Sequence, residues 1–256
     1  MLKIENMTMR FGGVVAANKF NAHIKKGQIV GLIGPNGAGK TTIFNVVTGV
    51  YKPTEGKVIF NPGDKEHDIT GMAPDEIAKL GVCRTFQNIR LFKDMTVLDN
   101  VFIGNHLRIK SNVFSSIIRV PSYRKEEREM FEKSLYLLDR VGLLDEKDEK
   151  AHSLPYGKQR RLEIARALAT EPKLLLLDEP AAGMNPQESK ELMDFILNIK
   201  DEFDLTVFLI EHHMDVVMGI CEDILVLDHG ELIAQGDPEA IQKDHMVIEA
   251  YLGVDK

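Results

Sequence analysis

The stretch that decides the fold reads Ile29-Val30-Gly31-Leu32-Ile33-Gly34-Pro35-Asn36-Gly37-Ala38-Gly39-Lys40-Thr41-Thr42. Residues 29–33 form a continuous apolar run, which is typical of a strand buried on both faces of a sheet. A glycine-rich loop follows, and residues 41–50 favour a helix that Gly49 helps to end. A buried strand, a glycine loop and a helix in this order predict one unit of an α/β fold.

The loop itself predicts a phosphate site, because residues 34–42 match the pattern G-x-x-x-x-G-K-[ST]. Glycines let backbone N–H groups curl around phosphate oxygens, and the following helix points its positive end at them. Lys40 can reach the outer phosphates, and the Thr41 hydroxyl can ligate Mg²⁺. The flanking strand and helix disfavour a chance match to a glycine-rich turn. We therefore predict a nucleoside triphosphate site made by Gly34, Pro35, Asn36, Gly37, Ala38, Gly39, Lys40, Thr41 and Thr42.

A second motif places two carboxylates at the end of another apolar strand, Leu174-Leu175-Leu176-Leu177-Asp178-Glu179-Pro180. Ligands bind at the carboxyl ends of strands in open α/β sheets. Asp178 would hold Mg²⁺ directly or through water, and Glu179 would orient and polarise an attacking water. Taken alone, the motif could be a strand that ends in acidic turn residues. Together with the phosphate loop it predicts nucleotide hydrolysis.

The rest of the chain alternates buried strands with helices, which predicts a largely parallel sheet. After the helix expected at 156–169, strands are expected at 173–178 and 205–210, with a helix at 187–200 between them. Residues 88–158 are helix-rich and predict an inserted helical subdomain, within which residues 104–125 favour an exposed insertion. We expect core segments at 1–87 and 159–235, and a C-terminal helix over 236–256.

Composition restricts the remaining functions. The formal net charge is −7, which disfavours binding nucleic acid through a general basic surface. Cys83 and Cys221 are far apart and indicate reduced thiols rather than a disulfide scaffold. We expect no signal peptide, because residues 1–11 alternate polar and apolar side chains, and no stretch approaches the roughly 18–20 apolar residues of a membrane span.

The segment Ser153-Leu154-Pro155-Tyr156-Gly157-Lys158-Gln159-Arg160-Arg161-Leu162-Glu163-Ile164-Ala165-Arg166-Ala167-Leu168 resembles the signature motif of ABC ATPases, usually written LSGGQ, with its helix. Ser153 can cap that helix, whose N-terminal end is an anion site. An amphipathic helix with an exposed basic face is the alternative interpretation. The resemblance implies contact with the γ-phosphate of ATP held by a partner subunit, through Leu154, Tyr156, Gly157 and Lys158.

Four further matches appear in the order that the ABC family has. Phe11 resembles the aromatic that stacks on adenine, and Gln87 the glutamine that links the site, with its Mg²⁺, to the helical subdomain. His212 resembles the histidine that senses the γ-phosphate, and residues 181–186 resemble the loop that signals across the dimer. The resemblance implies a P-loop NTPase (RecA-like) core with an N-terminal antiparallel β-subdomain. It also implies that Glu179, His212 and Lys40 carry ATP hydrolysis.

The sequence departs from the family pattern at two positions. Pro155 replaces the usual signature serine, so the hydroxyl contact to the γ-phosphate cannot form, and Gly157 and the helix-end amides must carry more of it. Asn185 stands where an aspartate is common and can hydrogen-bond without bringing charge. Neither change touches Glu179, so we expect activity to survive.

Within the family, four segments resemble those of the ATP-binding subunits of branched-chain amino-acid importers, namely residues 84–92, 154–166, 180–186 and 210–212. This implies two membrane permeases, a second related ATPase subunit or a second copy of the chain, and an extracytoplasmic substrate-binding protein as partners. It also implies a peripheral position at the cytoplasmic face of the membrane, with leucine, isoleucine and valine as cargo. Subunits for urea, short amides, hydrophobic anions or exported lipids and lipopolysaccharide are similar and remain alternatives.

Two other classes of function can be compared with this one. An ABC ATPase of DNA repair would need a long coiled coil or zinc-binding cysteine clusters, and a ribosomal one usually carries two ATPase units, none of which this sequence has. A small-molecule kinase with the same phosphate loop would consume ATP only with an acceptor. A transporter subunit should instead hydrolyse ATP slowly alone and faster with its permease.

Overall fold

The computed structural model describes residues 1–63, 65–108 and 121–252. The chain divides into two compact units, one made of Met1–Gln87 with Lys173–Lys256 and the other of Asn88–Pro172. The first unit contains both sheets, and the second unit is helical.

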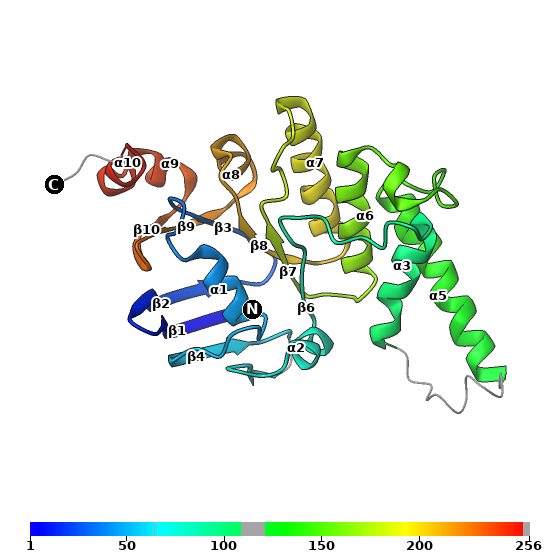
Figure 1. Cartoon of the computed structure of the whole chain (residues 1–256), viewed down its shortest axis with the longest axis horizontal. Coiled ribbons are helices and arrows are strands. Elements are labelled where there is room, and N and C mark those ends of the chain that lie inside the picture. Colours follow the sequence, from blue (N-terminus) through cyan, green and yellow to red (C-terminus); the bar gives the residue numbers. More distant parts are fainter. Residues whose placement is uncertain (64, 109–120, 253–256) are drawn as a thin grey trace. The chain divides into compact units, whose positions relative to one another are not determined.

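A six-stranded sheet forms the centre of the first unit, in the order β10-β9-β3-β8-β7-β6 (Figure 1). Its strands from β9 to β6 are parallel, and β10 joins β9 in the antiparallel sense. β3, β7 and β8 are buried over their whole length, as their continuous apolar runs predict. The bounds are β3 Ile29–Ile33, β6 Val82–Arg84, β7 Leu174–Asp178, β8 Thr206–Ile210, β9 Asp223–Asp228 and β10 Glu231–Gly236.

A second, antiparallel sheet follows the order β2-β1-β4-β5. Its side chains alternate between buried and exposed along β2, so one face is apolar. Phe20 and Phe60 from this sheet join Phe208 of β8 and Phe44 of helix α1 (Lys40–Val47) in one hydrophobic core. The bounds are β1 Leu2–Phe11, β2 Val14–Ile24, β4 Glu55–Phe60 and β5 His67–Asp68.

Helices complete the first unit: α1 Lys40–Val47, α2 Pro74–Leu80, α7 Pro186–Glu202, α8 Met214–Ile220, α9 Pro238–Lys243 and α10 His245–Leu252. The start of α7 shows why Asn185 is tolerated. Its side chain accepts a hydrogen bond from the Glu188 N–H at 3.0 Å, and the Glu188 carboxylate accepts one from the Asn185 N–H at 2.9 Å. This reciprocal capping needs an oxygen acceptor but no charge on residue 185.

The second unit contains α3 Val97–Asn105, η1 His106–Arg108, α5 Pro121–Arg140, η2 Ala151–Ser153 and α6 Tyr156–Leu168. α3 packs against both α5 and α6. Polar groups are buried among these helices in pairs. Asn105 donates to the Ser134 hydroxyl at 3.0 Å, and Arg160 forms an ion pair with Glu163 at 2.7 Å.

The predicted architecture is confirmed: an α/β core with a mostly parallel sheet, an antiparallel β-subdomain and an inserted helical subdomain. Within the described residues, no helix combines the length and apolar character that a membrane span requires. The expected insertion at 104–125 lies partly outside the described residues, since residues 109–120 are not among them.

Three details differ from the sequence predictions. The expected boundary between 158 and 159 falls inside α6, which belongs whole to the second unit because it packs on α3. The expected C-terminal helix is two helices, α9 and α10, separated at Asp244. The predicted cap of α6 was wrong. Pro155 is the N-cap residue, no side chain caps the helix there, and the Ser153 hydroxyl instead donates to the Lys150 carbonyl at the 3₁₀ turn before it.

Candidate functional site

Four loops emerge at one edge of the parallel sheet. β3, β8, β7 and β6 are consecutive neighbours and run in the same direction. Their carboxyl ends therefore open on the same side, where α/β sheets bind ligands. The segments that follow them begin at Gly34, Glu211, Glu179 and Thr85. The sheet order thus brings together residues that are up to about 180 positions apart.

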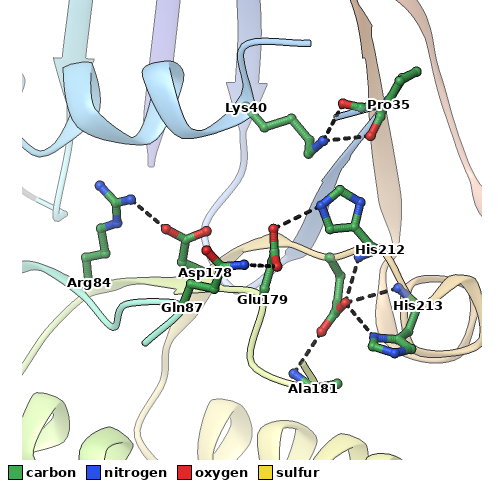
Figure 2. Close-up of polar contacts among 11 residues, drawn as sticks. Pro35, Lys40, Arg84, Gln87, Asp178, Glu179, Ala181, His212 and His213 are labelled. Carbon is green, nitrogen blue, oxygen red and sulfur yellow. Dashed lines mark hydrogen bonds and ion pairs between the residues drawn. The ribbon is translucent and has the colours of Figure 1, made fainter. Parts of the chain in front are cut away.

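The glycine loop after β3 is closed on itself by Lys40. The ammonium nitrogen of Lys40 donates to the carbonyl oxygens of Gly34 at 2.6 Å and Pro35 at 2.8 Å (Figure 2). A Cβ atom on Gly34 would lie 1.9 Å from the Leu227 carbonyl oxygen, and one on Gly39 would lie 2.2 Å from the Ala16 carbonyl oxygen. Both glycines also have positive φ angles, so no other residue fits without moving the backbone.

Lys40 is buried, with 6% of its surface exposed. Burial lowers the pKa of its ammonium, and the nearby carboxylates of Glu179 and Asp178 act in the opposite direction by favouring the charged form. The positive charge is therefore held in a site where water screens it little. A bound anion would interact with it more strongly than with a surface lysine.

Glu179 has two side-chain partners in the first unit. Its Oε1 lies 2.9 Å from His212 Nε2, and its Oε2 accepts a hydrogen bond from the Gln87 amide at 2.6 Å (Figure 2). Its φ angle is +47°, a conformation that costs energy for a residue with a side chain. The backbone N–H of Glu179 is fixed by a 2.8 Å hydrogen bond to the Ile210 carbonyl. Three predicted site residues are thus joined directly.

Asp178 is held differently. Its Oδ2 lies 2.6 Å from the Arg84 guanidinium, which also donates to the Asn45 side chain at 2.6 Å. The guanidinium lies 5.4 Å from the ring centre of Phe44 and 5.2 Å from that of Phe86. No motif in the sequence predicted this role for Arg84 or Asn45. A cation at the end of a strand was a weak signal, because its partner is 94 residues away.

A pocket of about 230 Å³ lies over the glycine loop. Its lining combines backbone N–H groups at the start of a helix, one ammonium, hydroxyls and a carboxylate, from Ala16, Asn36, Gly37, Ala38, Gly39, Lys40, Thr41, Thr42, Glu179 and His212. The loop and Lys40 fit the phosphates of a nucleotide. The oxygen atoms of Thr41, Gln87 and Asp178 are the hard donors that Mg²⁺ prefers. The residues present therefore fit both groups.

Phe11 lies apart from that lining. It ends β1, is 43% exposed, and packs edge-on against Tyr51 with ring centres 5.2 Å apart. An aromatic ring exposed to this extent can stack on a planar ligand. Ala16, on the strand β2 that pairs with β1, does line the pocket.

The four signature candidates belong to the second unit, around the start of α6. Leu154 is buried, and its carbonyl accepts a hydrogen bond from the Gln159 side chain at 2.8 Å. Tyr156 is exposed, and its hydroxyl accepts a hydrogen bond from Arg160 at 3.3 Å. The ammonium of Lys158 pairs with Glu146. A Cβ atom on Gly157 would meet nothing within 4 Å, so this turn is open to an approaching group.

Comparison with known proteins defines the class. Residues 17–182 match the ABC transporter family, and residues 231–256 match the C-terminal family of branched-chain amino acid ATP-binding cassette transporters. The chain belongs to the ABC transporter family and is the ATPase type of subunit. The resemblance drawn from the motifs is confirmed.

Particular relatives place it more narrowly. The chain is 45% identical over 253 residues to the high-affinity branched-chain amino acid transport ATP-binding protein LivG of Escherichia coli. The aligned region covers 99% of this chain and 98% of LivG. It is 44% identical to BraF of Pseudomonas aeruginosa, a protein of the same description, with the same coverage.

Solved structures agree with these relatives. The ADP conformation of MJ1267, an ATP-binding cassette of an ABC transporter, superposes with a TM-score of 0.85 at 35% identity and covers 99% of this chain and 98% of MJ1267. A dimeric post-hydrolysis state of the cassette MJ0796, bound to ADP and Pi, gives a TM-score of 0.75 at 26% identity, covering 93% of this chain and 99% of MJ0796.

Proposed function

We propose that this chain hydrolyses Mg²⁺-ATP on the glycine loop and thereby energises import of leucine, isoleucine and valine through separate permease subunits. The observation that carries the hydrolytic part is the carboxylate of Glu179, which lines the pocket and lies 2.9 Å from His212. The cargo rests on similarity to LivG and BraF, whose names state branched-chain amino acid transport.

Each predicted site residue of the first unit has a role in this proposal. Residues 34–42 bind the phosphates through backbone N–H groups, and Phe11 stacks on the adenine. Glu179 orients a water for in-line attack, while Lys40 and His212 stabilise the charge that develops on the phosphoryl oxygens. Thr41, Gln87 and Asp178 would hold Mg²⁺, partly through water, and the metal would offset phosphate charge when bound.

The proposal includes pairing of two cassettes around ATP. The signature residues Leu154, Tyr156, Gly157 and Lys158 of one subunit would cover the nucleotide on the other. The dimeric state of MJ0796 with ADP and Pi supports such pairing. The open turn at Gly157 and the free first-turn N–H groups of α6 supply the anion contact. They replace the serine hydroxyl that Pro155 removes.

The partners in this proposal are two permeases, a second related cassette or a second copy of this chain, and an extracytoplasmic binding protein reached through the permeases. The chain would lie at the cytoplasmic face of the membrane, held there by the permeases. No nucleic acid is involved. Transport of urea or short amides, or export of lipid or lipopolysaccharide, remains the second candidate cargo class, because the residues of the site do not touch the cargo.

Uptake by whole cells tests the proposal. In cells that lack this chain, we expect uptake of labelled leucine, isoleucine and valine to fall, with labelled urea uptake unchanged. The wild-type chain should restore uptake, and the Glu179→Gln variant should not. The Glu129→Gln variant is the matched control, since that carboxylate is exposed on α5. Loss of urea uptake alone, or unchanged uptake of all three amino acids, would contradict the proposed cargo.

A further inference from the structure

A buried carboxylate lies behind the candidate catalytic pair. Glu211 directly follows β8, and only 1% of its surface is exposed. Burying a carboxylate costs several kcal/mol unless hydrogen bonds or charges compensate it. The groups that hydrogen-bond to the Glu211 carboxylate therefore indicate its role in the structure.

The two carboxylate oxygens of Glu211 face different loops. Oε1 accepts a hydrogen bond from the Ala181 N–H at 2.8 Å, in the loop that follows Glu179. Oε2 accepts hydrogen bonds from the N–H groups of His212 at 2.6 Å and His213 at 3.0 Å, and lies 3.1 Å from His213 Nδ1. One side chain thus links the backbone on both sides of the Glu179–His212 pair.

Regular strand pairing cannot supply this link. The ladder between β7 and β8 ends at Asp178 and Ile210, and one more hydrogen bond joins the Glu179 N–H to the Ile210 carbonyl at 2.8 Å. Beyond this point the chain turns away into two loops. Glu179 must also be kept at a φ angle of +47°, which an unrestrained loop would relax. A charge-assisted link between the loops supplies the restraint.

We propose that Glu211 is a positioning residue for ATP hydrolysis: it sets the separation of Glu179 and His212 by fixing the backbone of both loops. This inference rests on the proposed role of Glu179. Glu211 does not touch the nucleotide pocket in this arrangement, so it should affect turnover rather than nucleotide binding.

The Glu211→Gln variant tests the proposal, because it preserves the shape and removes one acceptor. A glutamine has a single carbonyl oxygen, and its NH₂ group would face an N–H donor at Ala181 or at His212 and His213. We expect kcat for ATP hydrolysis to fall about 10- to 100-fold, as for misplacement of a catalytic group by up to 1 Å. The KM for ATP and the Kd of a non-hydrolysable ATP analogue should stay within about 3-fold of wild type.

A matched control separates positioning from general structure. Glu222 also accepts a backbone hydrogen bond, from the Ile29 N–H at 3.3 Å, but lies next to β9 and is half-exposed. The Glu222→Gln variant should keep wild-type kcat. If the Glu211→Gln variant does not fold, the Glu211→Asp variant retains both acceptors with a shorter reach and should show the same lowering of kcat at constant KM, to a smaller extent.

Combination with His212→Ala gives the decisive readout. Because part of the effect of Glu211 passes through His212, the loss of kcat caused by Glu211→Gln should be at least about 3-fold smaller in the His212→Ala background than in the wild-type chain. The loss that is left reports on the Glu179 loop. An equal loss in the two backgrounds, an unchanged kcat in Glu211→Gln, or a parallel loss of analogue binding and thermal stability would each overturn the proposal. Absence of ATPase activity in the wild-type chain would instead refute the proposed function.

Discussion

The guanidinium of Arg84 lies 2.6 Å from the carboxylate of Asp178, and both side chains are buried, with 6% and 7% of their surfaces exposed. Arg84 ends β6 and Asp178 ends β7, and the parallel pairing of these neighbouring strands brings their last side chains together. Gln87 follows shortly after Arg84, and Glu179 follows directly after Asp178. The ion pair therefore holds together the two segments that carry Gln87 and Glu179. It therefore contributes to stability as well as to the site.

Replacing Arg84 should destabilise the protein strongly. The Arg84→Met variant keeps an apolar stem but leaves the Asp178 carboxylate buried without its counter-charge. We expect the free energy of unfolding to fall by about 3–5 kcal/mol, measured by urea denaturation.

The exposed ion pair between Lys26 and Asp204 provides the control for this prediction, since its side chains are 54% and 63% exposed. The Lys26→Met variant should leave the urea midpoint nearly unchanged. If Arg84→Met proved as harmless as this control, the buried pair would have no structural role.

Removing the Lys40 ammonium should weaken nucleotide binding itself. Its donors now satisfy the carbonyls of Gly34 and Pro35, and a bound phosphate would compete for the same charge. We expect the Lys40→Ala variant to raise the Kd of a fluorescent ATP analogue about 10- to 150-fold, the equivalent of ~1.5–3 kcal/mol for hydrogen bonds to a charged group. The Lys243→Ala variant, in which an exposed lysine of α9 is lost, should bind the analogue normally. Unaltered affinity in Lys40→Ala would contradict the phosphate-loop assignment.

Cys221 should be inert as a nucleophile. Burial, followed by the negative charges of Glu211 and Glu222, raises the pKa of its thiol from 9.0 to about 12. At pH 9 the native protein should therefore react with iodoacetamide at Cys221 about 100-fold or more slowly than the urea-unfolded protein does. Equal rates in the two states would contradict this burial.

The raised pKa of the Cys221 thiol also makes stability depend on pH. Below pH 9 the thiol is protonated in both states and contributes no pH dependence. Between pH 9 and 12 the unfolded state loses the proton first, so Cys221 should lower the free energy of unfolding by up to about 1.4 kcal/mol per pH unit. Comparison with the Cys221→Ala variant isolates this contribution, because the variant should lose stability less steeply over that range. Parallel pH profiles for the two proteins would show that the thiol does not titrate differently on unfolding.

Those parts of the site that depend on a short stretch of residues could be predicted from the sequence. The strand at Ile29–Ile33 follows from an apolar run, and the loop conformation follows from Gly34 and Gly39, at which a Cβ atom would collide with the backbone. The carboxylates at the end of β7 were also visible, because their position depends only on where the strand ends.

Errors arose where the cause was not local. Ser153 has the chemistry of a helix cap, yet the turn that precedes α6 places its hydroxyl elsewhere. The limit of the helical unit was placed too early, because the sequence of α6 does not reveal that this helix packs against α3.

The order and chemistry of the motifs therefore came from the sequence alone: a phosphate loop, an acidic strand end and a signature helix, each encoded within about 15 neighbouring residues. The tertiary structure decided the pairs, namely Arg84 with Asp178, Gln87 and His212 with Glu179, and Glu211 with two loops at once. The reason is geometric, since parallel strands that are neighbours in the sheet come from distant parts of the chain. Which strand ends meet is fixed only when the sheet assembles around its buried core.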